Sequence, residues 1–467
     1  MKRKYIIRTC IIIMAISLFP SCEDFVDVPA PENKMVKEIV FNDDATARSA
    51  MTGIYNQLFL SAFSNGQRSS VTVLAGLSGD NIRNINTTNI TRMQFEANEL
   101  LPENTNNLDL WSSAYAVIYM TNSLLEGLGS SDKISTDLNV QLEGEARFIR
   151  AFTYFYLVNL YNDVPLILST DYRENQLSTR APISEVYEQI INDLQLAQEF
   201  LNIEYRDEER TQVNSYAARA LLARVYLFLE DWEKAEDHST AVIQAKSHYE
   251  ILENLNEVFL ANSREAIWQI SPIGSGFSTH TNEGSVFIID PVFTFLASFQ
   301  LEEDFVQVFQ EEDKRLTDWI EYHNNLEVYF SHKYKVRNST DFPIEEYSMV
   351  LRLAEQYLIR AEARIHRGDL TGALEDLDTI RQRAGLDSLT ETNTEIGETS
   401  LLEEIMGERR KELFTEWGHR WLDLKRTGKV ESVIGHENPQ WEYTDIWYPI
   451  PAEERMRNPN LTQNDGY

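Results

Sequence analysis

A cysteine near the start of the chain stands where its thiol could be chemically modified. Basic residues at positions 2–4 precede an apolar run at 11–16, and the small Ser21 then precedes Cys22. A basic start, a short apolar stretch and a small residue are typical of a secretory signal peptide, and this stretch is too short to span a bilayer. Because a thiol follows the small residue, the layout is similar to a lipoprotein signal. We therefore predict that residues 1–21 are removed and that Cys22 is lipidated.

The alternative is an ordinary secretory leader in which Cys22 has no special role. Two acids, Glu23 and Asp24, follow at once and no other cysteine occurs in residues 23–467, which favours the lipid anchor. Cys10 lies within the predicted leader, so the mature chain would keep no thiol for a disulfide, a zinc site or a nucleophile. Two or more acyl chains would then hold the protein at the membrane without a transmembrane helix.

The other titratable residues give no sign of a catalytic or metal site. The eight histidines show no HExxH or paired spacing, and glycine-rich phosphate loops and EF-hand spacing are absent from the sequence. Among 74 acidic residues a glycosidase-like pair is expected by chance, so no catalytic pair can be singled out. The net charge of −32 repels phosphate backbones and anionic lipid. The composition therefore argues against a nucleic-acid partner, and we predict no cofactor and no metal ion. The alternative is a calcium ion held by loop oxygens such as those of Asp80 and the neighbouring Asn residues.

The elements that would position a site are mainly helices. Apolar residues recur at three- and four-residue steps, which predicts successive helix pairs. The four expected pairs are 108–128 with 137–161, 184–201 with 214–230, 231–246 with 349–367, and 369–384 with 400–417. The third pair would be interrupted by residues 250–345, so we expect this insertion to pack back onto the helices.

An internal repeat supports the helix pairing. At an offset of 138 residues, two sets of residues match: Ala223, Asp231, Trp232 and Ala235 against Ala361, Asp369, Leu370 and Ala373. Small residues allow two helices to approach closely, the acid suits the turn, and the large apolar residue packs between the helices, as in tetratricopeptide repeats. The predicted fold is therefore mostly α, a tetratricopeptide-like superhelix of about four helix pairs.

The remaining segments lack the helical period. Residues 22–41 contain two prolines and several acids and indicate a short lipidated tether. Residues 61–107 are rich in Asn, Ser, Thr and Gly, and a long stretch of that kind is usually functional or mobile. The insertion contains β-leaning pieces at 267–270 and 286–289, so we expect an irregular, loop-rich part with short strands. We thus predict one domain at 42–467, with helical repeats at 108–246 and 349–417, the insertion at 250–345 and an extended tail at 435–467.

Several runs along the chain together resemble one protein family. They are GEARFIRAF at 144–152 with YNDVPL at 161–166, RLAEQYLIRAEAR at 352–364, ERRKELF at 408–414 with GHRWLDLKR at 418–426, PIP at 449–451 and NPNLTQN at 458–464. These runs occur in order over nearly the whole chain and resemble the SusD/RagB family of outer-membrane lipoproteins. Their charged residues stand beside apolar ones, so we interpret them as ion pairs along helix faces and not as catalytic groups.

The resemblance implies a function in nutrient uptake. A SusD-like protein is not an enzyme, and it would lie at the outer membrane, held by its lipid and facing the exterior. It would capture an oligo- or polysaccharide and deliver it to a SusC-like TonB-dependent transporter. A RagB-like member would bind a peptide with the same fold. A surface glycoside hydrolase and a scaffold that holds only protein partners are further alternatives.

The resemblance also implies where a ligand would bind. In this family the ligand face tends to form from variable loops near the N-terminus and from the non-repeat insertion, here 61–107 and 272–300. Sugar rings stack on aromatic planes, and their hydroxyls pair with Asn, Asp and Arg side chains. The candidate ligand residues in these loops are Asp80, Asn81, Arg83, Asn84, Asn86, Phe95, Phe277, His280 and Asn282. The alternative for each is a structural role, because Asn in particular favours turns.

Overall fold

The computed structural model describes residues 40–276, 278–393, 396–436, 438 and 440–467. The predicted signal peptide, Cys22 and nearly all of the predicted tether lie outside the described residues, as does Phe277. Across the described ranges, no helix is both long enough and apolar enough to cross a membrane.

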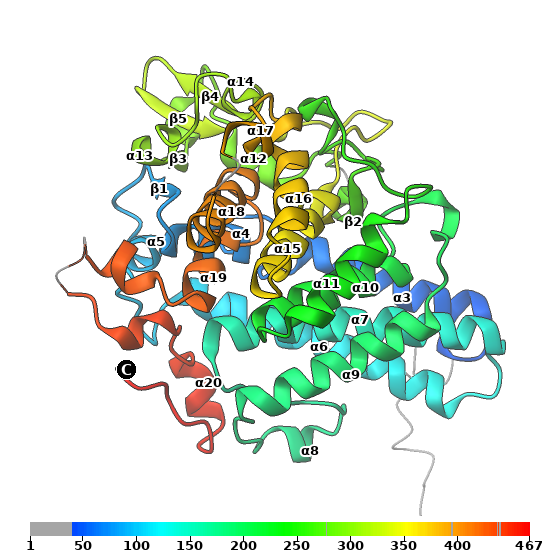
Figure 1. The fold of residues 1–467 in the computed structure, drawn as a ribbon. Coiled ribbons are helices and arrows are strands. Elements are labelled where there is room, and N and C mark those ends of the chain that lie inside the picture. Colours follow the sequence, from blue (N-terminus) through cyan, green and yellow to red (C-terminus); the bar gives the residue numbers. More distant parts are fainter. Residues whose placement is uncertain (1–39, 277, 394–395, 437, 439) are drawn as a thin grey trace, which may run out of the picture.

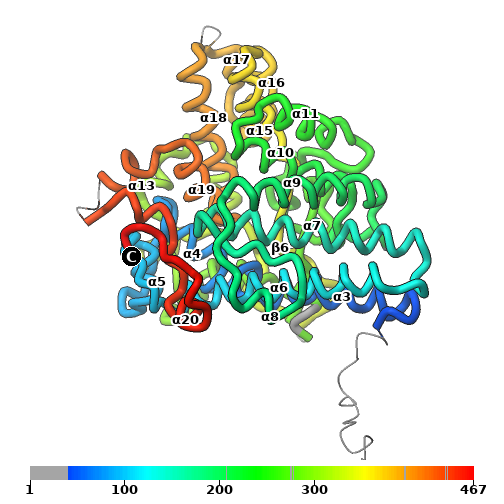
Figure 2. The backbone as a smooth tube through the Cα atoms, turned by 90° about the horizontal axis from the view of Figure 1, so that it is seen from below, coloured from blue at the N-terminus to red at the C-terminus, as the bar shows by residue number. Residues whose placement is uncertain are grey.

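The four helix pairs that the sequence predicts are present. They are α6 (Thr105–Ser130) with α7 (Thr136–Tyr161), α9 (Ile183–Phe200) with α10 (Ser215–Phe228), α11 (Trp232–Ile243) with α15 (Leu353–His366), and α16 (Leu370–Arg383) with α18 (Glu398–Glu412). The two helices of each pair are in contact, and α7 also packs on α9, α10 on α11 and α15 on α16. Figures 1 and 2 show these helices following one another from α6 to α18. The prediction of a mostly helical fold built from repeated pairs is confirmed.

The repeat residues explain how neighbouring helices start and pack. Asp231 and Asp369 cap the N-termini of α11 and α16, and each accepts a hydrogen bond from the backbone N–H three residues later, at 3.3 and 3.0 Å. Such a cap satisfies an N–H that has no partner within the helix. The four matched alanines are fully buried, so the helix backbones can approach closely. Trp232 stacks on His366 with ring centroids 4.0 Å apart and thereby joins α11 to α15.

Helix α7 lies at the centre of the hydrophobic core. The ring of Phe152 contacts the rings of Trp268 and Trp417 edge-on, with centroids 5.0 and 5.1 Å apart. Trp268 belongs to β2 (Ala266–Ile270) in the insertion, and Trp417 follows α18. Edge-to-face packing of buried aromatic rings adds to the stability that their burial provides. The repeat helices, the insertion and the C-terminal part therefore share one core.

The insertion packs back onto the helices through two small sheets, as expected. Strand β2 pairs antiparallel with β6 (Ser348–Arg352), and these strands contact α10 and α15. The second sheet has the order β1-β3-β5-β4, with strands Ile82–Asn84, Phe299–Leu301, Val328–Ser331 and Ile320–His323. Because β1 pairs with β3, the segments 61–107 and 272–300 lie together at the edge of the helical array where Figure 1 shows this sheet.

Two expectations about the irregular segments are corrected. Residues 286–289 do not form a strand, because the Thr281 hydroxyl accepts a hydrogen bond from the Gly284 N–H at 3.1 Å and starts α12 (Asn282–Phe287). The C-terminal tail is not extended throughout, since it contains α20 (Ala452–Arg457). The segment 61–107 also contains the short helices α4 (Val71–Ser78) and α5 (Ile90–Glu96).

The remaining elements are short, apart from α3, which packs on α6 and α7. The helices are α3 (Asp44–Leu60), α8 (Tyr172–Asn175), α13 (Glu303–Val306), α14 (Lys314–Asp318), α17 (Leu389–Thr392) and α19 (His419–Arg426). Single helical turns of 3-10 or π type lie at Arg206–Glu208, Leu255–Glu257, Pro272–Ser275, Thr294–Leu296, Glu431–Gly435 and Tyr443–Ile446. Helix α19 packs on α4 and so brings the C-terminal helices to the N-terminal segment.

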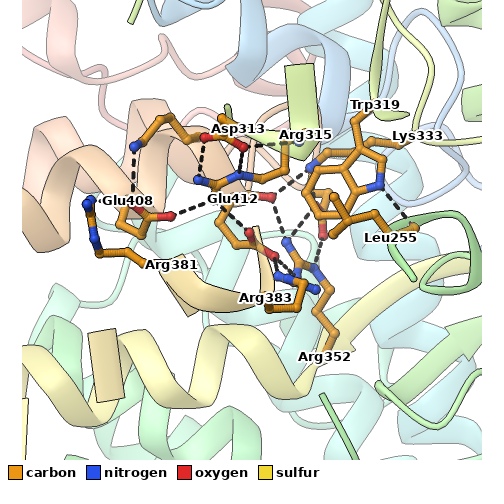
Figure 3. Close-up of polar contacts among 12 residues, drawn as sticks. Leu255, Asp313, Arg315, Trp319, Lys333, Arg352, Arg381, Arg383, Glu408 and Glu412 are labelled. Atoms are coloured by element: carbon orange, nitrogen blue, oxygen red, sulfur yellow. Dashed lines mark hydrogen bonds and ion pairs between the residues drawn. The ribbon is translucent and has the colours of Figure 1, made fainter. Parts of the chain in front are cut away.

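A buried ion-pair network joins the insertion to the last helices, and Figure 3 shows most of it. Its members are Glu265, Asp313, Arg315, Lys333, Arg352, Arg383, Glu408, Glu412 and Glu416. Glu412 lies 2.9 Å from Arg315 and 2.6 Å from Arg352, and it also pairs with Arg383. Burial disfavours its charge, but these guanidiniums and Lys333 outweigh burial and hold the pKa of Glu412 well below its usual value. The charged residues at 408–412 form ion pairs, as interpreted, but apart from the pair of Glu408 with Lys411 their partners lie on other elements and not along the same helix face.

Candidate ligand-binding face

Asp80 and Asn81 lie in the turn between α4 and β1, where they bind two arginines of the last helices. The Asp80 carboxylate pairs with Arg420 at 2.5 and 2.8 Å and with Arg410 at 2.8 Å. The Arg410 Nε also donates to Asn81 Oδ1 at 2.8 Å. Burial disfavours ionisation of Asp80, but the hydrogen bond and charges of the two arginines outweigh it, so the pKa of this carboxyl is lowered. The turn is therefore fixed to α18 and α19 by charge.

Three of the predicted ligand residues are buried and have structural roles. Asn81 and Asn84 have almost no exposed surface, and Glu96 accepts hydrogen bonds from the N–H and the side-chain amide of Asn84 at 2.7 and 2.8 Å. The ring of Phe95 is fully buried and meets Tyr448 edge-on at 5.2 Å between centroids. The prediction that Asn81, Asn84 and Phe95 contact a ligand is therefore wrong, because these side chains point into the protein.

Two other predicted residues, Asp80 and Arg83, line a polar cavity of about 410 Å³ beside β1. The rest of its lining consists of Gly79, Ile82, Met93, Glu96, Ala97, Asn98, Glu302, Asp304, Arg410, Val433, Ile434 and Asn438. Arg83 forms an ion pair with Glu302, and Asp80 forms one with Arg410. Carboxylates outnumber arginines in this lining, so the cavity suits a neutral polar ligand better than an anion.

The predicted residues of the second segment lie apart from this cavity. His280 is half-buried, and its Nδ1 accepts a hydrogen bond from the backbone N–H of Ser339 at 2.9 Å. Asn282 donates to the Asn65 carbonyl at 2.7 Å and accepts from the Gln67 amide at 3.2 Å. Asn282 is buried and ties α12 to the turn after α3, so its prediction as a ligand residue is also wrong. His280 stays a prediction.

The most exposed apolar feature of this region is a loop within the predicted segment 272–300, although the sequence analysis selected none of the residues of this loop. We call residues 290–298 the aromatic loop. The rings of Phe293 and Phe295 are 53% and 80% exposed, and their centroids are 6.0 Å apart at nearly a right angle. Asp290 fixes the start of the loop, since its Oδ1 accepts hydrogen bonds from the N–H groups of Val292 and Phe293 at 2.9 and 2.8 Å. Contiguous exposed apolar side chains mark binding surfaces in soluble proteins.

The end of the aromatic loop lies against the first predicted segment. The Ser298 carbonyl accepts a hydrogen bond from the Ile85 N–H at 3.0 Å, and its hydroxyl accepts one from Arg68 Nε at 2.8 Å. The neighbouring Asn86 is exposed, and its Oδ1 holds a turn by accepting from the Thr88 N–H at 2.9 Å. Asn86 is therefore a predicted residue that stays exposed, and it directly follows Ile85, which bonds the end of the aromatic loop.

The predicted segment 272–300 contains these two exposed rings, but sequence reasoning did not select them. The available signal was the Asp290-Pro291 pair, which favours a turn, followed by a short apolar run without helical period. Within the described part of the chain, no group of three His, Cys, Asp or Glu residues could hold a metal ion. Exposed rings beside polar groups suit a ligand that presents both apolar faces and hydrogen-bonding groups.

Comparison with known proteins places this architecture in a family. A family model described as "Starch-binding associating with outer membrane" matches residues 24–227, and a second, the SusD family, matches residues 299–467. The curated SusD-like protein P2 of Formosa agariphila is 26% identical over the full length of both chains.

Solved structures show the same fold. A SusD superfamily protein from Bacteroides vulgatus has 20% identity and a TM-score of 0.81, and the match covers 91% of this chain and 100% of the other. A laminarin-binding SusD-like protein has 23% identity and a TM-score of 0.77, with the same coverage. The chain thus has the fold of a class of binding proteins associated with the outer membrane. It belongs to the SusD/RagB family.

Proposed function

We propose that this protein captures a glycan on the aromatic loop and delivers it to a SusC-like TonB-dependent outer-membrane transporter. In this proposal the lipid on Cys22 holds the protein at the outer membrane with the aromatic loop toward the exterior. The protein binds its glycan without cleaving it.

The exposed pair of phenyl rings is the observation that carries the proposal. Two neighbouring rings left in water are unfavourable unless something covers them. The C–H face of a sugar ring can stack on each phenyl plane, while its hydroxyls pair with polar side chains at the edge of the loop. Asn86 and Arg68 are available there. The apolar rings and the polar side chains of this surface thus match the apolar faces and the polar edges of a saccharide.

The family supports a glycan over a peptide as the ligand. The matching family is described as starch-binding, and one structural neighbour is named for binding laminarin. The buried acids of residues 408–416 support binding without catalysis, because ion pairs with Arg315, Arg352 and Lys333 occupy them. A carboxylate held in this way has no access to a glycosidic bond.

Calorimetric titration of the full-length lipoprotein in detergent tests the ligand site. The panel consists of laminarin, starch oligosaccharides, acidic polysaccharides and mixed peptides. We expect a glycan in the panel to bind. Combined Phe293→Ala and Phe295→Ala substitution should weaken its binding about tenfold or more, because the stacking surface is lost. The matched control is Tyr172→Ala, which removes an exposed ring on α8.

The possible outcomes separate the alternatives. Unchanged glycan affinity in the double variant would show that the glycan binds outside the aromatic loop. Binding of peptides but of no glycan would support the RagB-like alternative. Shortened chains after incubation with the bound glycan would show a hydrolase. Mass spectrometry of the mature N-terminus tests the anchor, and co-purification with a TonB-dependent transporter tests the partner.

A further inference from the structure

Three arginines surround the aromatic loop, and we call them the arginine cluster. Arg68 donates from Nε to the Ser298 hydroxyl at the end of the loop, at 2.8 Å. Arg337 pairs with Asp290 at the start of the loop, at 3.1 Å, and donates to the Ile288 carbonyl at 3.2 Å. Arg92, on α5, lies over the ring of Phe299, 5.2 Å from its centroid, directly after the loop. The two ends of the loop are thus each bound by a guanidinium.

The arginine cluster has too few neighbouring carboxylates to balance its positive charge. Asp290 pairs with Arg337, but among the described residues neither Arg68 nor Arg92 forms an ion pair. Arg92 is only 8% exposed, and its Nη1 has no hydrogen-bond acceptor within the described part of the chain. A buried cation without an anion is unfavourable.

Most other buried arginines of the described residues pair with a carboxylate, and Arg210, which does not, donates to the Ala266 and His248 carbonyls. Arg224 is fully buried and lies 2.6 Å from a Glu355 oxygen, and Arg315 pairs with three carboxylates. The chain as a whole carries a net charge of −32. A local excess of positive charge beside an exposed aromatic loop is therefore an exception, and it indicates that an anion from outside completes the cluster.

The pKa values of the cluster agree with this geometry. Burial and the neighbouring Arg337 lower the pKa of Arg68, and burial and Arg68 lower the pKa of Arg92. The arginines are thus close enough for their charges to repel one another. A bound anion would relieve this repulsion, and Arg68, which is exposed, can reach it directly.

We propose that the aromatic loop takes a saccharide that carries an anionic group, either a carboxylate or a sulfate ester. Phe293 and Phe295 stack on the sugar, and Arg68 binds its anionic group through the paired N–H donors of the guanidinium. Arg92 and Arg337 supply the positive field behind Arg68. This inference rests on the proposed glycan-binding function and adds the charge of the ligand. The acidic cavity lined by Asp80 does not suit such a ligand.

The test compares saccharides that differ only in charge. Polygalacturonate is titrated against its fully methyl-esterified form, and a sulfated galactan against the same polymer after chemical desulfation, with neutral laminarin as reference. We expect the charged member of at least one pair to bind about tenfold or more tightly than its neutral partner. The pair that shows the preference distinguishes a carboxylate from a sulfate. Salt should weaken binding of the charged member, because ions screen the attraction.

Variants then assign the preference to the cluster. Arg68→Gln should remove most of the charge preference, taken as the ratio of the affinities for the charged and the neutral partner, and Arg68→Lys should restore part of it. Arg173→Gln, which removes an exposed arginine on α8, is the control and should keep the wild-type preference. Thermal melting checks that each variant is folded.

Each outcome decides between the inference and the function on which it rests. If neutral and charged partners bind equally and depend on Phe293 and Phe295, the charge inference fails and the glycan-binding function stands. If Arg68→Gln keeps the full preference, the inference fails as well. If no saccharide binds, or an acidic peptide binds in place of every saccharide, both fail.

Discussion

Replacing Glu412 by Gln tests how far the buried ion-pair network stabilises the fold. The substitution keeps the shape of the side chain and removes one negative charge that faces Arg315, Arg352 and Arg383. Removal of one partner from a buried ion pair costs roughly 3–5 kcal/mol. Here each guanidinium keeps at least one other carboxylate. We therefore expect a loss of about 3 kcal/mol, at the lower end of that range.

Differential scanning calorimetry measures this loss. For a chain of this length the entropy of unfolding is about 0.9 kcal/mol/K, so a loss of about 3 kcal/mol lowers Tm by about 3–4 °C. The matched control is Glu404→Gln on the same helix, whose half-exposed carboxylate is 4.0 Å from Arg381. That control should shift Tm by less than about 1 °C, as exposed ion pairs contribute little. A variant at Glu412 that melts with the wild type would refute the stabilising role of the network.

The loss of stability in the Glu412→Gln variant should depend on pH. Because the pKa of Glu412 is lowered in the folded protein, its charge stabilises the fold at every pH above the unfolded pKa of about 4.3. That stabilisation is lost as the pH falls below this value toward the folded pKa. The Tm difference between wild type and Glu412→Gln should therefore be full at neutral pH and shrink in acid.

Two further predictions concern the helix pairs. Ala361→Trp places a large ring at a fully buried position of α15. It should lower the free energy of unfolding by roughly 1–3 kcal/mol or more through overpacking. An unchanged thermal midpoint would contradict close packing of α15 against its neighbouring helices. Asp369→Ala removes the cap of α16 and should cost about 1 kcal/mol in urea unfolding, whereas Asp369→Asn should keep most of the stability. Equal losses in both Asp369 variants would show that the cap is not the cause.

The helix pairs could be predicted because their signal is local and repeated. The apolar period, the alanines and the acidic caps at Asp231 and Asp369 all lie within one or two turns of the structure that they determine. The irregular part gave weaker signals. The short run 286–289 has strand-forming residues. The cap at Thr281 and the packing against β3 nevertheless favour the helix α12 over a strand.

The ligand face was harder to predict because exposure depends on contacts distant in sequence. Phe95 and Phe293 are the same residue type in segments that both lack a clear helical period in the sequence, yet Phe95 is buried against Tyr448 and Phe293 is 53% exposed. Asn84 and Asn86 are two residues apart, and only Asn86 is exposed. The pairing of β1 with β3 holds Asn84 inside the protein, and Tyr448 covers Phe95. Neither partner is indicated by the residues of the segment itself.

The way in which the aromatic loop is held has a consequence for how the protein can evolve. Its fixed points are Asp290 and Ser298, and the exposed side chains between them contribute little to the core. Substitutions at these positions therefore cost little stability, and proteins tolerate such changes readily. Under the proposed function, descendants of this chain can acquire affinity for a different saccharide by altering a few exposed positions while the helical repeats stay unchanged.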